Sequence, residues 1–527
     1  MKTRPTGNSL GRVGASALIA GCLAANVIQA ADSSSNRLIT YPAPEGAPQS
    51  GDFRVTVRTP GGVWQQVAVY QVKVDAIADN KHLPVNTSMA YFDFSGDVEV
   101  SITCNRGGIQ SARVRPLSFG ITPEVSGNTI TFALTQPRNL AVEVNGDIFG
   151  NLHLFANPIE LSRPDPRDPD VIYFGPGIHQ VADNAILAAS PAQPRPEMKD
   201  PNANNGPRAT VREMERRTLR VPGGKTVYIA GGAILRGRIL CDRVENVRII
   251  GRGMVEQGES GGGVCIANSR NVEVSGIFTP QCFTGGSQHV TIMNVKCMSF
   301  VGNGDGMNVV SSSDVLIDDV FNRNSDDCIT VYGTRGGFTG SASRITVQNS
   351  TLWADVAHPI LAGTHGNTPN PDTLEELRFI NIDILDHKEP QLDYQGCLSL
   401  NAGDSNLIRN VRFEDIRVED FRQGQLVNLR VFFNRKYCTS PGRGIENVYF
   451  KNITYTGTHA EPSVIAGYDD ARKVTNVVFE NLVINGSVIS DRMPKPAWYR
   501  TSDMAGIFVS EHVDRVEFRE TNKTLKR

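Results

Sequence analysis

Asn246-Val247-Arg248-Ile249 is the first clear copy of a short repeat that decides the fold. In each copy a polar residue precedes an apolar one, and a second apolar residue follows two positions later. Further copies begin at Asn271, His289, Asp314, Arg344, Glu376, Asn410, Asn447, Asn476 and Arg515, at intervals of 18–39 residues. Self-similarity at such a period indicates a solenoid, in which each repeat forms one unit stacked on the next.

The alternation within each copy indicates strands rather than helices, because one face is buried at every second residue. A strand-only repeat of variable length predicts a right-handed parallel β-helix with loops inserted at its corners. The Asn and Asp residues suit these corners, where the backbone adopts left-handed conformations. A β-propeller is the alternative, but its blades would repeat about every 40–50 residues. The shorter and uneven intervals favour the β-helix.

The β-helix, expected to carry the catalytic site, is predicted to cover residues 170–520. The strand-like residues 170–177 and 227–235 supply its first coils, and the Pro- and Asn-rich residues 188–208 between them predict an exposed loop. Residues 31–162 differ, since turn residues separate their strand-like runs at hairpin spacing. They predict an N-terminal antiparallel β-sandwich. The expected fold class of the whole chain is therefore all-β.

Residues 1–30 have the pattern of a signal peptide. Basic residues precede an apolar run over residues 13–30, and Ala30-Ala31 offers a cleavage site with small side chains. We therefore expect a secreted or periplasmic protein. The sequence Ile19-Ala20-Gly21-Cys22 also resembles a lipoprotein box, so a lipid anchor at Cys22 is the alternative.

The composition is that of a globular protein and argues against several functional classes. The chain has 527 residues, of which 40% are hydrophobic and 20% charged, which is too apolar for a disordered protein. Its formal charge of −2 gives no reason to expect a nucleic-acid partner. No segment after the N-terminal one is expected to span a bilayer. Eight cysteines follow Cys22, without a CxxC pair and mostly in apolar runs, so we expect buried free thiols and no structural zinc site.

Three aspartates carry the chemistry that the sequence predicts. Asp305 lies in Asn303-Gly304-Asp305-Gly306, and the pair Asp326-Asp327 begins 21 residues later. Because this spacing is about one coil, the carboxylates are expected side by side on neighbouring coils, roughly 4.8 Å apart. Carboxylates this close cannot all ionise, so one keeps its proton near neutral pH. A protonated acid beside an ionised one is suited to hydrolysing a glycosidic bond.

Three polar residues are expected to support the aspartates. His365 lies in Gly363-Thr364-His365-Gly366, in the coil region after the acid pair, and is predicted to hydrogen-bond an active carboxylate and tune its pKa. His358, from the same segment, is a weaker candidate for this role. Asn303 is predicted to be either a hydrogen-bonding neighbour of the acids or a corner residue.

Together these motifs resemble the polygalacturonase-type glycoside hydrolases of family 28. They also resemble the dextranases and isopullulanases of family 49, and a β-sandwich before the β-helix is more similar to that second group. The resemblance implies an inverting hydrolase in which Asp326 is the general acid, while Asp305 and Asp327 hold and deprotonate the attacking water. Inversion needs about 6.5–9.5 Å between acid and base. No metal or organic cofactor is implied.

One feature of polygalacturonases is absent from this chain. They carry an Arg-Ile-Lys element one coil after the histidine, and the corresponding residues 396–401 contain no cation. Arg430 and Lys436, one coil further on, are candidate substitutes. Binding a uronate without a paired cation is costly. We therefore expect a neutral polysaccharide, such as an α-glucan, in preference to polygalacturonate.

Two other functions remain open from the sequence. A β-helix polysaccharide lyase would use the acid cluster to hold calcium, and a non-catalytic carbohydrate-binding solenoid would need no cluster chemistry at all. All three hypotheses share a polysaccharide or oligosaccharide partner. The sequence does not determine the oligomeric state.

Overall fold

The computed structural model describes residues 36–78, 81–181, 217–256 and 263–521. The predicted signal peptide, with Cys22, and the predicted loop at residues 188–208 lie outside the described residues. Nearly all regular structure in the described ranges is β-strand, and their single α-helix is α2 (Thr501–Met504). No helix within those ranges is long and apolar enough to cross a membrane. The all-β prediction is confirmed.

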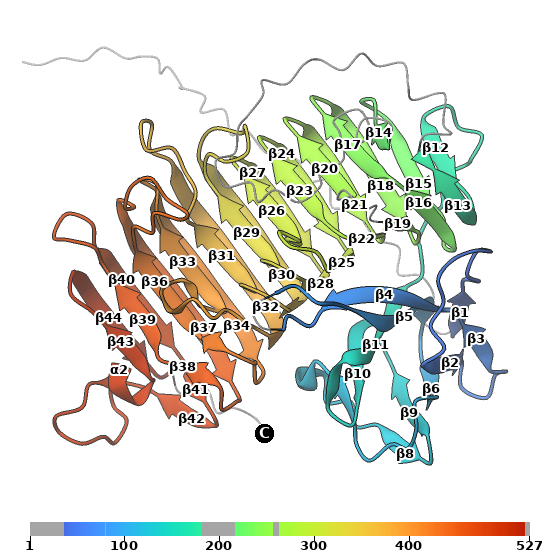
Figure 1. The fold of residues 1–527 in the computed structure, drawn as a ribbon, viewed down its shortest axis with the longest axis horizontal. Coiled ribbons are helices and arrows are strands. Elements are labelled where there is room, and N and C mark those ends of the chain that lie inside the picture. Colours follow the sequence, from blue (N-terminus) through green and yellow to red (C-terminus); the bar gives the residue numbers. More distant parts are fainter. Residues whose placement is uncertain (1–35, 79–80, 182–216, 257–262, 522–527) are drawn as a thin grey trace, which may run out of the picture. The chain divides into compact units, whose positions relative to one another are not determined.

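Each coil of the β-helix contributes one strand to each of three parallel ladders, and Figure 1 shows these strands stacked from β12 to β44. The first ladder contains β12 (Val171–Phe174), β15 (Thr226–Ile229), β18 (Glu245–Gly251), β21 (Arg270–Ser275), β24 (Gln288–Met293), β27 (Ser313–Asp318), β30 (Ala342–Ala354), β32 (Thr373–Asp386), β34 (Leu407–Val418), β37 (Gly444–Tyr455), β40 (Val474–Glu480) and β44 (Val513–Arg519). The long strands β30, β32, β34 and β37 turn a corner and continue into the second ladder.

The second ladder otherwise contains β13 (Gly177–Gln180), β16 (Ala233–Arg236), β19 (Met254–Glu256), β22 (Phe278–Thr279), β25 (Lys296–Met298), β28 (Phe321–Asn324) and β41 (Leu482–Ile484), which pairs antiparallel with β42 (Ser487–Ile489). The third contains β14 (Thr218–Arg220), β17 (Arg238–Asp242), β20 (Gly263–Ala267), β23 (Cys282–Gly285), β26 (Met307–Val310), β29 (Ile329–Tyr332), β31 (Ile360–Gly363), β33 (Leu398–Ala402), β36 (Val427–Val431), β39 (Ser463–Ala466) and β43 (Ile507–Val509). The short strands β35 (Gly424–Gln425) and β38 (Ala460–Glu461) pair separately.

The copies of the repeat lie in register in the first ladder. Val247 pairs with Val272, and the same position continues through every later copy to Val516. The polar residue that precedes this position has a positive φ in all ten copies, from 54° at Asn271 to 67° at Arg515. These are the left-handed corners that the Asn and Asp residues predict. The side-chain amide of Asn271 also donates a 3.1 Å hydrogen bond to that of Asn246, so the corner residues form a ladder of their own.

The second apolar position of the repeat fills the core between the ladders. In the last five copies it is Phe379, Phe413, Phe450, Phe479 and Phe518, whose rings stack with centroids 4.5–5.0 Å apart. A single cluster of buried apolar residues runs the length of the β-helix. Cysteines 241, 282, 297, 328 and 397 belong to this cluster and act as small apolar side chains.

The N-terminal residues form two β-sheets that pack face to face around a separate apolar core. The first sheet contains β1 (Arg37–Thr40), β4 (Val69–Asp75), β5 (Pro84–Ser95), β7 (Ala112–Arg115), β10 (Arg138–Val144) and β11 (Asp147–Pro158). The second contains β2 (Phe53–Arg58), β3 (Gln65–Val67), β6 (Val98–Cys104), β8 (Glu124–Ser126) and β9 (Thr129–Leu134). The strand pairing is antiparallel as predicted, except that β5 and β11 pair in parallel. A parallel pair needs a long connection, and the strands between β5 and β11 provide it.

Buried charges join the sandwich to the β-helix. Arg252 donates to both oxygens of Asp93 at 2.9 and 3.1 Å, and Arg115 donates to Glu419 at 2.7 Å. In Figure 1 the strands β4 and β5 lie beside β25 and β28, where aromatic residues of both domains pack together. The sandwich is therefore fixed against coils on both sides of the predicted acid pair.

Candidate active site

Strand register brings two of the predicted acids and one histidine to equivalent positions on three successive coils. The site lies where three neighbouring strands begin: Asp305 is two residues before β26, Asp327 two before β29 and His358 two before β31. These strands pair in that order. Backbone hydrogen bonds extend the pairing up to the site, since Cys328 N–H donates to the His358 carbonyl at 2.8 Å. The third ladder therefore lines these side chains up one strand spacing apart, at roughly 4.8 Å.

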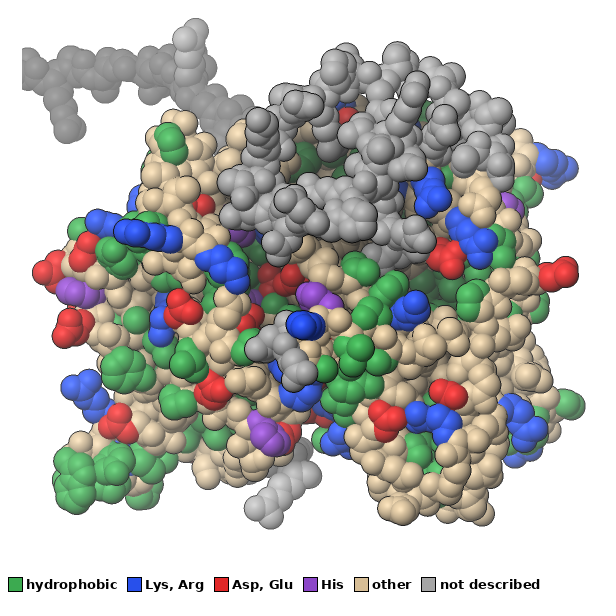
Figure 2. Space-filling model, viewed as in Figure 1, with side chains coloured by type: hydrophobic (Ala, Val, Ile, Leu, Met, Phe, Trp, Pro, Cys, Tyr) green, Lys and Arg blue, Asp and Glu red, His purple; other side chains and the backbone are tan. Residues whose placement is uncertain are grey.

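The three predicted acids form one compact cluster. One carboxylate oxygen from each of Asp305, Asp326 and Asp327 lies within 4.8 Å of the other two. Asp305 and Asp326 are half-buried and Asp327 is buried, so the first two acids are accessible to solvent. Figure 2 shows acidic side chains in a hollow near the middle of the molecule's face. Oxygens this close could also ligate a divalent cation, which is what the calcium-dependent alternative requires.

Asp327 is held as an anion by its neighbours. Its Oδ1 lies 2.7 Å from Nδ1 of His358 and accepts a 3.1 Å hydrogen bond from the His358 backbone, while its Oδ2 accepts one from the Tyr332 hydroxyl at 3.1 Å. Burial alone would raise the pKa of Asp327, but the charge and hydrogen bonds of His358 lower it below its usual value. The other ring nitrogen of His358 donates to the Tyr394 carbonyl at 2.5 Å. With an acceptor at each nitrogen, the pKa of His358 is raised despite burial.

Asp326 has the opposite environment. Burial, followed by the charges of Asp305 and Asp327, raises its pKa well above the usual value, and a 3.1 Å hydrogen bond from the Asp327 backbone offsets this only in part. Asp305 is intermediate, because burial and the charge of Asp327 raise its pKa to about 6, while Arg335 and a 2.7 Å hydrogen bond from Asn308 lower it. One carboxyl is therefore protonated near neutral pH and one is ionised.

The predicted role of His365 is filled by His358. The ring of His365 packs edge-on against Tyr332, with centroids 5.1 Å apart, and its pKa falls to about 3 because it is buried near Arg335. His365 lies beyond the end of β31, whereas His358 lies at the coil position equivalent to Asp327. Counting back from the apolar start of each strand would have selected His358 in the sequence. Asn303 is an exposed corner residue with φ of 55°, and its carbonyl accepts a hydrogen bond from Gln281.

The two predicted substitute cations lie away from the acids. Arg430 is on β36, three strands beyond β29 in the third ladder, which places it about 14 Å along the axis from the acid pair. Lys436 is exposed and donates to the side chain of Gln391 at 3.1 Å.

Arg335 is the cation that the sequence prediction missed. It follows β29, its guanidinium lies 4.6 Å from the centre of the Tyr332 ring, and its charge acts on Asp305. Its position in a loop carries no repeat signal.

Residues 263–497 match the family described as glycosyl hydrolases family 28, and this segment contains the three acids and His358. The predicted resemblance to the polygalacturonase-type clan is confirmed. A probable endopolygalacturonase D from Neosartorya fischeri is 25% identical over 187 residues, or 35% of this chain and 36% of the relative. A probable endo-xylogalacturonan hydrolase A from Aspergillus fumigatus is 25% identical over 215 residues, or 38% of this chain and 50% of the relative. The chain thus spans about a third to a half of these relatives.

The solved structure of Dex49A from Penicillium minioluteum resembles almost the whole fold. It covers 92% of this chain and 96% of its own, with a TM-score of 0.57 and 14% sequence identity. At this identity the likeness concerns the fold alone. It extends the resemblance beyond the family 28 segment to most of the chain.

Proposed function

We propose that this protein is a glycoside hydrolase that cleaves a polysaccharide by acid–base catalysis with inversion at the anomeric carbon. The observation that carries the proposal is the cluster of three carboxyls with oxygens within 4.8 Å of one another, in which burial and neighbouring charges favour a protonated Asp326 beside an ionised Asp327. The family 28 match over residues 263–497 and the curated relatives named as galacturonan hydrolases support the same reaction class.

Each acid has a defined role in the proposed step. Asp326 donates its proton to the glycosidic oxygen as the bond from that oxygen to the anomeric carbon breaks. A water molecule attacks the same carbon from the opposite side and loses a proton to the carboxylate of Asp327, with Asp305 helping to hold it. A proton must then return from the base to Asp326, through water, before the next turnover. Solvent can reach Asp326 because its side chain is half-buried.

The compactness of the cluster bears on the stereochemistry. The nearest oxygens of the three acids lie within 4.8 Å of one another. This is closer than the roughly 6.5–9.5 Å between carboxyls that inversion usually requires, and it is nearer to the roughly 5–5.5 Å of retaining enzymes. Against retention, both oxygens of Asp327 already accept hydrogen bonds, and Asp305 accepts one from Asn308. A carboxylate held in this way is poorly placed to form a covalent bond with the sugar. We therefore propose inversion, with retention as the alternative.

The charges beside the acids give two candidate substrates. The coil of β33 supplies Ser399 and Asn401, both buried, at the positions that correspond to the Arg-Ile-Lys element of polygalacturonases, which favours a neutral α-glucan. Arg335 favours a second candidate, an acidic glycan such as a galacturonan, because an exposed guanidinium beside the acids can pair with a sugar carboxylate. We propose the neutral glucan first and name the galacturonan as its competitor.

A substrate screen with product analysis tests the proposal. The purified protein is incubated with dextran, pullulan, polygalacturonate and other plant and bacterial glycans, and the first product anomers are followed by NMR. Fresh product with the inverted configuration supports the mechanism, and retained configuration replaces it with the retaining one. Cleavage that requires calcium and gives an ultraviolet-absorbing product identifies a lyase. Binding that leaves every glycan intact identifies a non-catalytic solenoid.

We also propose that residues 1–30 direct export, because a large polysaccharide outside the cell is accessible only to an exported enzyme. N-terminal sequencing of the protein made by cells that secrete it tests this. A start at or near Ala31 supports cleavage by signal peptidase, and a lipid-modified Cys22 at the N-terminus supports the anchored alternative.

A further inference from the structure

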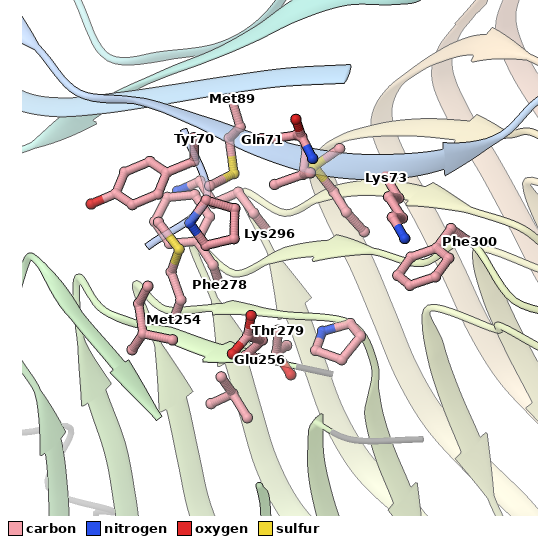
Figure 3. Close-up of a pocket in the computed structure, with 16 residues that line it drawn as sticks. Tyr70, Gln71, Lys73, Met89, Met254, Glu256, Phe278, Thr279, Lys296 and Phe300 are labelled. Atoms are coloured by element: carbon pink, nitrogen blue, oxygen red, sulfur yellow. The ribbon is translucent and has the colours of Figure 1, made fainter. Parts of the chain in front are cut away.

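A cavity lies between the sandwich and the β-helix, and none of the three acids lines it. It has a volume of about 430 Å³, which is within the range of small-ligand sites. Figure 3 shows residues of β4 on one side and the ends of β19, β22 and β25 on the other. Neither domain forms this cavity alone.

The cavity has a mostly apolar lining with a few polar side chains. Phe278 and the methionines 89, 254 and 298 line the cavity, and the ring of Phe300 stands at one end with the ammonium group of Lys73 5.3 Å from its centre. Gln71 and Glu256 provide polar atoms on opposite sides of the cavity. An aromatic ring beside hydrogen-bonding groups suits a sugar, which has an apolar face and a rim of hydroxyls.

Of the two lysines in the cavity, one is available to a ligand. Lys296 is buried, and its ammonium group donates to the side chain of Asn157 at 2.6 Å and to the carbonyl and side chain of Asn294. These three acceptors use all of its donors. Lys73 is exposed and forms no ion pair within the described part of the chain. Its three donors can therefore reach a ligand in the cavity.

A short loop connects this cavity to the acid cluster. Phe300 lines the cavity and Asp305 belongs to the cluster, so only four residues separate them. The side chain of Ser325 donates to the Val301 carbonyl, and Gln281 donates to the carbonyl of Asn303 at 3.3 Å, which fixes the loop at both sides. Strand β25 belongs to the coil of Asp305, and β22 and β19 belong to the two coils before it. Those two strands therefore lie about 5–10 Å from that coil along the axis of the β-helix.

We propose that this cavity is a distal subsite that binds a sugar residue of the same polysaccharide chain, away from the bond that is cleaved. The sugar ring packs against Phe300, and its hydroxyls accept from Lys73 and bond to Gln71 and Glu256. The sandwich thus takes part in substrate binding through β4. This inference rests on the proposed hydrolase function.

The test compares substrate length in full-length variants. Phe300→Ala and Lys73→Met are assayed on a ladder of oligosaccharides prepared from the glycan that the wild-type protein cleaves. Phe508→Ala is the matched control, because this ring is 61% exposed on β43, far along the chain from the cavity. We expect kcat/KM on the polymer to fall about tenfold in each cavity variant, through a higher KM. We expect kcat/KM on the shortest cleaved oligosaccharide, and kcat on the polymer, to stay at wild-type values.

Direct binding provides a second readout. Calorimetry with the same ladder is carried out on Asp326→Asn, with and without Phe300→Ala, and affinity should rise with chain length only when Phe300 is present. If the cavity variants lose kcat/KM equally on short and long substrates, or lose none on either, the distal subsite is overturned and the hydrolase proposal stays intact. A wild-type protein that cleaves no glycan would instead reject the hydrolase function, and the subsite with it.

Discussion

His358 Nδ1 lies 2.7 Å from Oδ1 of Asp327, and both side chains are buried. Each group favours the charged form of the other, so the carboxylate is ionised and the imidazole protonated in the folded protein. Burial raises the pKa of Asp326 and of Asp305, and the negative charge of Asp327 adds to both shifts. Burial and this ion pair together set the order in which the three acids lose their protons.

Replacing the proposed general acid should abolish turnover but not binding. We expect Asp326→Asn to lower kcat by about 10²–10⁴, the usual contribution of a positioned proton donor. The affinity for the glycan, measured by calorimetry, should stay within about twofold of the wild-type value. Asp470→Asn is the control, because the Asp470 side chain is 95% exposed, and its kcat should not change. A fully active Asp326→Asn would rule out this residue as the acid.

The pH profile should show the three acids separately. On the alkaline side kcat/KM should fall as Asp326, whose pKa is raised, loses the proton that it donates. On the acid side we expect kcat/KM to decrease in part near pH 6, as Asp305 becomes protonated. Activity should be lost completely only below the usual aspartate range, where Asp327 becomes protonated. In Asp305→Asn the step near pH 6 should disappear. Complete loss of activity at pH 6 would instead identify Asp305 as the only base.

Removing the charge of His358 should destabilise the protein in a pH-dependent way. We expect His358→Gln to cost about 3 kcal/mol in the free energy of unfolding, because it leaves Asp327 buried without its partner. Asp327 has a lowered pKa, so its stabilising contribution is lost as pH falls through the folded value, below the ordinary 3.8. His358 has a raised pKa, so its contribution is complete below 6.5 and is lost as pH rises through the folded value.

The free energy of unfolding, measured in urea, should therefore differ most between this variant and the wild type at about pH 4–6. The difference should be smaller at lower and at higher pH. A difference that does not change with pH would mean that the interaction is not an ion pair. Without His358 the pKa of Asp327 should rise, so the variant should lose all activity at a higher pH than the wild type.

Arg335 should distinguish the two candidate substrates. If a galacturonan is the substrate, we expect Arg335→Gln to lower kcat/KM on polygalacturonate about 10–100-fold. If a glucan is the substrate, we expect the same variant to change kcat/KM on dextran little. Since the guanidinium lowers the pKa of Asp305, its removal should move the step near pH 6 upward on either substrate. Arg435→Gln is the control, because Arg435 is also an exposed arginine beside an aromatic ring. Equal effects of the two variants would remove Arg335 from the site.

The buried pair of Arg323 and Asp355 should matter for stability rather than catalysis. Two hydrogen bonds of 3.0 Å join these side chains, which have no exposed surface, and Arg323 also donates to Asn151 of the sandwich at 3.2 Å. Asp355→Ala should cost about 3–5 kcal/mol in urea unfolding, because Arg323 stays buried without its counter-ion. Glu273→Ala, which removes the exposed pair with Arg248, should cost less than about 1 kcal/mol. Similar losses in both variants would contradict this account.

Much of the candidate site could be read from the sequence because the solenoid repeats locally. The spacing between Asp305 and the acid pair is about one coil, and strand pairing then places Asp305 opposite Asp327 without information from elsewhere in the chain. Spacing alone could not select His358, which is found only by counting back from the apolar start of its strand. The coils vary from 18 to 39 residues, so the distance from the acid pair does not show which histidine shares its register.

The sequence by itself determined the parallel β-helix, the left-handed corners and the acid cluster, because each depends on residues within one or two coils. Only the tertiary structure decided which groups surround the acids and where the sandwich lies. Arg335 comes from a loop without a repeat, and the contact between Lys73 and Phe300 joins residues 227 positions apart. Such contacts depend on how loops and domains pack together, and neither local spacing nor strand periodicity records that packing.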